Sequence, residues 1–308
     1  MSAGWVAGSV RARLLTQRRL GPERALEAAA SPSLRDALTR LAGTGYLESE
    51  QITLSLEEAE RAVAATTLLE LRVIAGWLPR AGLELMRSLG AWFELANIED
   101  RLAYLLGGEL RHPFTLGSLA VAWPRVAQAE TPGEVRAALA ASVWGEPGGE
   151  TPAEIHRGLR LAWARRLFDQ VPEASEWIAG AVALFLAREV LQTHRTLDVL
   201  QVGRVLPVGP GWERASTPAD LAAALPSNAR WSLEDVHELE SLWRAEARWW
   251  ARIERDATAM ARRPQEGREV VIGAVALLAA DARRVIAALS TAARGARDEF
   301  QETHGAPA

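Results

Sequence analysis

Three stretches carry one helix-start signal: Ser31-Pro32-Ser33-Leu34, Thr131-Pro132-Gly133-Glu134 and Thr217-Pro218-Ala219-Asp220. A hydroxyl at the N-cap accepts a hydrogen bond from an otherwise unpaired backbone N–H, and proline at the first helical position has no N–H to lose. Each stretch runs into a segment rich in Ala and Leu that is closed by turn residues: Gly43 and Gly45, then Gly145, Pro147, Gly148 and Gly149, then Pro226 and Ser227. The pattern predicts one short helix that occurs three times.

A longer amphipathic helix is expected after each short one, because acidic residues in its first turn complement the helix dipole. The three starts are Ser55-Leu56-Glu57-Glu58, Thr151-Pro152-Ala153-Glu154 and Ser232-Leu233-Glu234-Asp235. A further helix is expected near residues 83–106, 173–202 and 269–294, with Gly and Pro clusters as linkers at 107–113, 203–211 and 264–267. These boundaries predict three helical units, at residues 1–107, 108–204 and 205–308.

Repetition of a helical unit has a physical consequence, since a helix hairpin must bury its apolar face against its copies. Three copies form either a linear array or a closed ring or funnel, and the periodicity does not choose between these arrangements.

Composition excludes several classes of protein. Of the 308 residues, 49% are hydrophobic, so disorder is excluded. The formal net charge is −4 and the arginines are interspersed with acids, which argues against nucleic acid as a partner. The absence of cysteine excludes thiolate chemistry and fits a cytoplasmic setting. No secretory signal precedes Arg11, and the longest apolar runs, 177–187 and 270–280, are about half as long as a membrane-spanning helix. Any attachment to a membrane is therefore expected through another protein.

Three stretches resemble a known family, the V-type ATPase subunit called d in eukaryotes and C in archaea and bacteria. The first is Val10-Arg11-Ala12-Arg13-Leu14-Leu15, followed by an Ala-rich helix and 38–46. The second is Trp92-Phe93-Glu94-Leu95-Ala96-Asn97-Ile98, leading through Arg101 to Leu106. The third is 271–289, which runs into Ala293-Arg294-Gly295. The chain departs from the family on its last helix, where Arg283, Arg284 and Ala288 replace acidic residues and an asparagine.

The resemblance implies an all-α funnel of three pseudo-symmetric helical subdomains that sits on the membrane's proteolipid ring. The central shaft of the rotary motor would insert into the funnel, so the expected function is non-catalytic coupling in a proton or sodium pump. No cofactor or metal is implied. The expected partners are the shaft subunits and the ring, and the expected location is cytoplasmic, at the membrane surface.

Candidate contact residues for these partners lie on three helices. Glu94, Asn97 and Arg101 are spaced i, i+3 and i+7 and share one helix face. This polar stripe either lines the funnel or forms a hydrogen-bonded network that fixes its helix against the next unit. Trp249 and Trp250 point about 100° apart on a helix, so one of them is expected near the surface. Arg283 and Arg284 complete the set.

Two alternatives remain open. One is a helical-repeat adaptor unrelated to the motor. The other is a helical metalloenzyme, because Glu109 and His112, and likewise Glu234 and His237, have the Glu-x-x-His spacing of di-iron bundles. Pro113 disfavours helical geometry at His112, and no additional pair of inward-facing glutamates is evident. The sequence also lacks His-Glu-x-x-His, a phosphate-binding loop and Gly-x-Ser-x-Gly.

Overall fold

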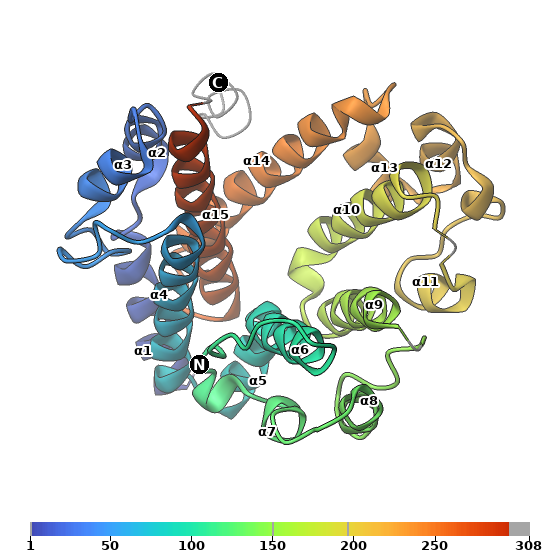
Figure 1. Cartoon of the computed structure of the whole chain (residues 1–308), viewed down its shortest axis with the longest axis horizontal. Coiled ribbons are helices and arrows are strands. Elements are labelled where there is room, and N and C mark those ends of the chain that lie inside the picture. The colour runs from blue at the N-terminus through green and yellow to red at the C-terminus, as the bar shows by residue number, and fades with distance from the viewer. Residues whose placement is uncertain (1, 150, 196, 296–308) are drawn as a thin grey trace. The chain divides into compact units, whose positions relative to one another are not determined.

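The computed structural model describes residues 2–149, 151–195 and 197–295. Within these residues the chain is helical and contains no strand, so the all-α prediction is confirmed. The backbone pairing outside helices includes one isolated bridge between Ala42 and Leu47. The helices divide into two compact units, each with its own core (Figure 1).

Unit 1 consists of residues 1–83 and of the chain from residue 250 onward. Its elements are α1 (Ala3–Thr16), α2 (Gly21–Ala29), α3 (Leu34–Leu41), α4 (Leu56–Trp77), the end of α14 (Leu242–Ala261) and α15 (Arg268–Arg294). The last helix, α15, packs against each of α1, α2, α3 and α4 (Figure 1, red against blue). The core therefore combines the beginning of the chain with its last helix.

Small residues allow these helices to approach closely. A Cβ atom on Gly273 of α15 would lie 2.6 Å from the carbonyl oxygen of Ala257 and 2.8 Å from the amide nitrogen of Ala261. The backbones of α14 and α15 therefore touch at a place where only glycine fits. The core of this unit is mostly Ala and Leu, as its composition predicts.

Unit 2 consists of residues 84–249. Its helices are α6 (Ala91–Leu105), α7 (Trp123–Val126), α8 (Pro132–Ala140), α9 (Pro152–Gln170), α10 (Ser175–Leu186), α11 (Val199–Val205), α12 (Pro218–Ala224) and α13 (Ser227–Arg230), joined by short helical turns. Helix α5 (Arg80–Leu89) crosses the boundary from unit 1. Helix α6 packs on α7, α8 and α9, and α10 packs on α9 and α13. A Cβ atom on Gly158 would lie 1.6 Å from the carbonyl oxygen of Pro147, so α9 also needs glycine where it meets the preceding loop.

Most of the predicted helix starts are present. Thr131 and Thr217 are N-caps whose hydroxyls accept hydrogen bonds from the amides three residues later, with proline next in sequence. Ser55 and Thr151 form reciprocal capping boxes with Glu58 and Glu154 at the starts of α4 and α9. In the first short helix, however, the cap is Ser33 and not Ser31, so Pro32 lies outside α3.

Three of the expected helices differ from the structure. The helix expected from Ser232 begins only at Leu242, because Asp235 adopts a left-handed conformation with φ 59° that interrupts it. The helix expected over 83–106 is divided into α5 and α6 at Gly90. The helix expected over 173–202 ends in a π-helical turn, Ala187–Gln192, and α11 follows separately.

The two compact units do not coincide with the predicted divisions after residues 107 and 204. The first predicted unit contributes to both, because residues 84–107 belong to unit 2. The division into three repeats and the funnel stay predictions.

Candidate functional site

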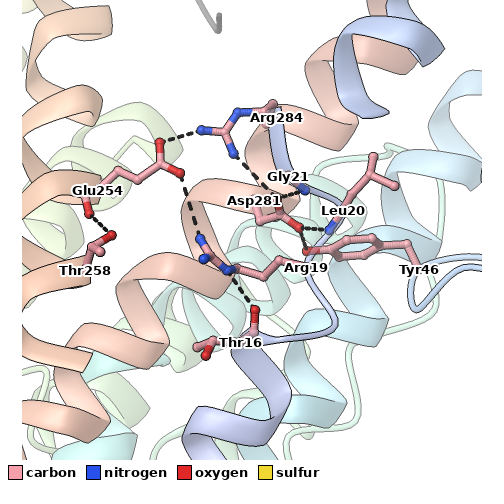
Figure 2. A network of polar contacts seen from close by, with 9 residues as sticks. All are labelled: Thr16, Arg19, Leu20, Gly21, Tyr46, Glu254, Thr258, Asp281 and Arg284. Atoms are coloured by element: carbon pink, nitrogen blue, oxygen red, sulfur yellow. Dashed lines mark hydrogen bonds and ion pairs between the residues drawn. The ribbon is translucent and has the colours of Figure 1, made fainter. Parts of the chain in front are cut away.

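A buried carboxylate organises unit 1. Asp281 of α15 is fully buried, and its two oxygens accept hydrogen bonds from two amides at the start of α2 and from one hydroxyl in the turn after α3. The amide of Leu20 donates to Oδ2 at 2.7 Å, the amide of Gly21 donates to Oδ1 at 2.9 Å, and the hydroxyl of Tyr46 donates to Oδ2 at 2.7 Å. Asp281 therefore joins three segments that are far apart in the sequence (Figure 2).

An arginine extends this network to α14. Arg284 is 6% exposed, and its Nη1 lies 3.4 Å from Oδ1 of Asp281 while its Nη2 pairs with Glu254. The second oxygen of Glu254 lies 3.8 Å from Arg19, whose Nε donates to the carbonyl of Thr16 (Figure 2). The charges thus alternate in sign from the buried Asp281 and Arg284 to the partly exposed Glu254 and Arg19, so the buried pair is compensated.

The network perturbs two neighbouring groups. Burial, reinforced by the charge of Asp281, raises the pKa of the Tyr46 hydroxyl, which therefore stays protonated and donates. Burial also raises the pKa of Glu70 to about 7, with a further contribution from Asp281 and an opposing one from Arg18. The Oε2 atom of Glu70 is buried and has no hydrogen-bond partner. Glu70 is thus the member of this region whose charge changes near neutral pH.

A second buried carboxylate organises unit 2. Glu94 of α6 is 2% exposed, and its Oε1 accepts hydrogen bonds from the amides of Val121, Ala122 and Trp123 at 2.7–2.8 Å. Its Oε2 accepts a hydrogen bond from the indole of Trp144 at 2.9 Å. Glu94 therefore holds the start of α7 and the loop after α8 against α6.

The rest of the predicted stripe on α6 acts in the same way. Asn97 is fully buried and makes two hydrogen bonds to the backbone of Phe114, one through each amide atom. Arg101 donates from Nε and Nη2 to the carbonyl of Ala129. Glu94, Asn97 and Arg101 thus form the internal network that was one of the two alternatives, and the two fully desolvated members present no surface to a partner.

The remaining predicted contacts are partly buried or buried. Trp249 donates from its indole nitrogen to the carbonyl of Trp177 at 2.8 Å. Trp250 lies beneath the guanidinium of Arg283, whose Cζ is 5.1 Å from the ring centroid. Arg284, in contrast, belongs to the buried network around Asp281. Trp250 and Arg283 are therefore the predicted residues that keep surface on unit 1.

The residues of the metalloenzyme alternative do not share helix faces. Glu109 and His112 lie in the irregular segment after α6, and Glu234 and His237 lie in the turns before α14. The i, i+3 argument therefore fails for both pairs. Among the described residues, no group of three or more histidines and acids is placed to hold a metal ion.

Sequence reasoning missed two features. Asp281 was not singled out, although it is the one acid that follows the uncharged run 270–280. The other feature is an exposed row on α1, here called the α1 stripe: Val6, Val10 and Leu14, which are 41%, 46% and 48% exposed at i, i+4 and i+8. On α4, which packs beside α1, Trp77 is 56% exposed. The i, i+4 and i+8 spacing predicts that these three side chains share one face of α1, but it does not predict that this face is exposed.

The chain matches no protein-family model and has no significant similarity to any curated protein. In the described part of the chain, no helix combines the length and the apolar character needed to cross a membrane. The geometry of the two units therefore carries the functional argument.

Proposed function

We propose that this chain is a non-catalytic coupling subunit of a rotary V/A-type ATPase. In this proposal it links the central shaft to the membrane proteolipid ring during proton or sodium transport, on the cytoplasmic side of the membrane. Its three repeats would form the funnel that receives the shaft.

The packing of α15 against α1, α2, α3 and α4 is the observation that carries the proposal. In a linear array each repeat contacts only its neighbours, so the first and last helices lie in different repeats. Here they share one core, which supports a closed arrangement. The buried networks around Asp281 and Glu94 also favour rigidity within each unit, a property that suits a part that transmits torque.

The α1 stripe supports a role in protein binding. Three apolar side chains in one row on α1 are exposed, and a cluster of exposed apolar side chains is typical of interaction sites. In the proposed assembly this row contacts the ring or the shaft.

Reconstitution tests the proposal. The purified chain should bind a complex of shaft subunits and proteolipid ring and restore ATP-driven ion transport to it. The triple variant Val6→Ser, Val10→Ser, Leu14→Ser should keep its thermal stability but lose binding. A control variant with two exposed leucines of unit 2 replaced, Leu110→Ser and Leu200→Ser, removes similar apolar surface and should bind normally. Failure of the unmodified chain to bind either partner would refute the proposal.

A helical adaptor outside the ATPase is the second candidate. It is favoured by the burial of Glu94, Asn97 and Arg284, which leaves three of the seven predicted contact residues with almost no surface for a partner. Under this hypothesis the α1 stripe binds a different protein, so the triple variant would lose that partner while the motor subunits bind neither form.

A further inference from the structure

Unit 2 contains a cavity of about 460 Å³ between the loop after α8, helix α9 and helix α11. This volume is within the range of small-molecule sites, about 300–1,000 Å³. One part of its wall is apolar and includes Trp144, Leu161 and Val205. The other part carries three arginines, from positions 165, 166 and 204, and two acids, from positions 146 and 169.

Both acids already have partners. Asp169 pairs with Arg165 at 2.9 Å, and Glu146 pairs with Arg136 at 2.6 Å. Two arginines of the cavity, Arg166 and Arg204, have no acidic partner within the described residues. The cavity therefore has two arginines without an ion-pair partner in the described part of the chain.

Arg166 is the more unusual of these two. Its Nε and Nη1 atoms are buried and have no hydrogen-bond acceptor. Two carboxylates, those of Glu94 and Glu84, act on its charge and oppose the lowering of its pKa by burial. Glu94, however, already accepts four hydrogen bonds, and Glu84 pairs with Arg87 at 2.8 Å. Because Arg166 is partly desolvated, an oxyanion that enters the cavity would offset the cost of burying its positive charge.

The chemistry of the wall defines the ligand class. Guanidinium groups match the geometry of oxyanions, and two arginines that lack ion-pair partners suit a dianion. The apolar wall suits a hydrocarbon or aromatic part beside that dianion. We propose that this cavity binds a small organic phosphate, with the phosphate held by Arg166 and Arg204 and the organic part packed on Trp144 and Leu161. The site does not depend on the coupling role.

Calorimetric titration of the full chain with phenyl phosphate tests the site. Saturable 1:1 binding is expected, with weaker binding of phenylacetate and inorganic phosphate and none of benzyl alcohol. Arg166→Met and Arg204→Met should each weaken phenyl phosphate binding by about tenfold to a hundredfold, the effect of losing a hydrogen bond to a charged group.

Arg160→Met is the matched control, because Arg160 is an exposed arginine on the same helix that does not line the cavity. It should leave the affinity unchanged. Absence of saturable binding to the wild type, or wild-type affinity in either folded cavity variant, overturns the proposal. If Arg166→Met does not fold, the Arg204→Met variant alone tests the proposal, because Arg204 is exposed and its replacement should not prevent folding.

Discussion

Replacement of Asp281 by asparagine should strongly destabilise unit 1. Asparagine preserves the size of the side chain but turns one of the two accepting oxygens into an NH₂ donor. An NH₂ group at Oδ2 would oppose the amide of Leu20, and one at Oδ1 would oppose the amide of Gly21. In either orientation a backbone N–H loses its acceptor, the buried one of Leu20 or the partly buried one of Gly21.

The expected loss follows from two contributions. An unsatisfied buried N–H costs about 1–3 kcal/mol. Arg284 also loses one of its two anionic partners, and breaking a buried pair costs about 3–5 kcal/mol when the remaining charge is left alone. Because Glu254 still pairs with Arg284, we expect a total near 3–5 kcal/mol, a large fraction of the about 5–15 kcal/mol typical of folded proteins.

Urea unfolding followed by far-UV circular dichroism measures this loss as a lower midpoint with an unchanged slope. Asp256→Asn is the control on α14, where the carboxylate is 32% exposed and lies 3.7 Å from Arg252 and 3.4 Å from Arg255. Its loss should stay below about 1 kcal/mol, as for other surface pairs. A loss below about 1 kcal/mol for Asp281→Asn as well would refute the idea that this carboxylate organises unit 1.

Three further changes test other parts of the structure. Glu94→Gln should cost about 1–3 kcal/mol in urea unfolding, because the new NH₂ group opposes either the Trp144 indole or the backbone amides at the start of α7; an unchanged midpoint would contradict this. Glu70 has a folded pKa of about 7, above its ordinary 4.5, so its stabilising contribution is complete below about pH 4.5 and is lost as the pH rises through about 7. The unfolding midpoint of the wild type should therefore fall relative to that of Glu70→Gln between about pH 5 and pH 8, and a constant difference would refute the assignment. Arg166→Met should leave the thermal midpoint of the ligand-free protein unchanged or raised, because it removes buried donors without acceptors; a clear decrease would show that this cation stabilises the fold.

Helix starts were predictable from the sequence because they depend on residues within one turn of each start. The helix starts at Ser55 and Thr151 each depend on four consecutive residues, and the sequence predicted both starts, although not the reciprocal capping boxes that form there. The same kind of signal failed at Ser232, where the chain turns at Asp235, because local signals do not report whether a helix continues. Continuation depends on packing against segments distant in the sequence.

The polar stripe on α6 shows the corresponding limit for sites. The spacing of Glu94, Asn97 and Arg101 correctly indicated a shared helix face. It did not indicate what the face contacts, because the partners of these side chains lie 17–50 residues further along the chain. The Asp281 cluster is more distant still, since its amide donors lie 260 and 261 residues away.

The two buried acids, Asp281 and Glu94, both accept hydrogen bonds from amides at the start of another helix. Helices α2 and α7 lack a side-chain cap of their own, because the residues at their N-caps are Leu20 and Ala122. Asp281 and Glu94 supply the missing acceptors from another helix, and a negative charge there also complements the helix dipole. A local cap stabilises only its own helix. An acidic side chain that belongs to a distant helix and accepts these hydrogen bonds also fixes the positions of the two helices relative to each other. Each unit therefore gains rigidity from the same hydrogen bonds that satisfy its backbone, which is the mechanical property that the proposed coupling role requires.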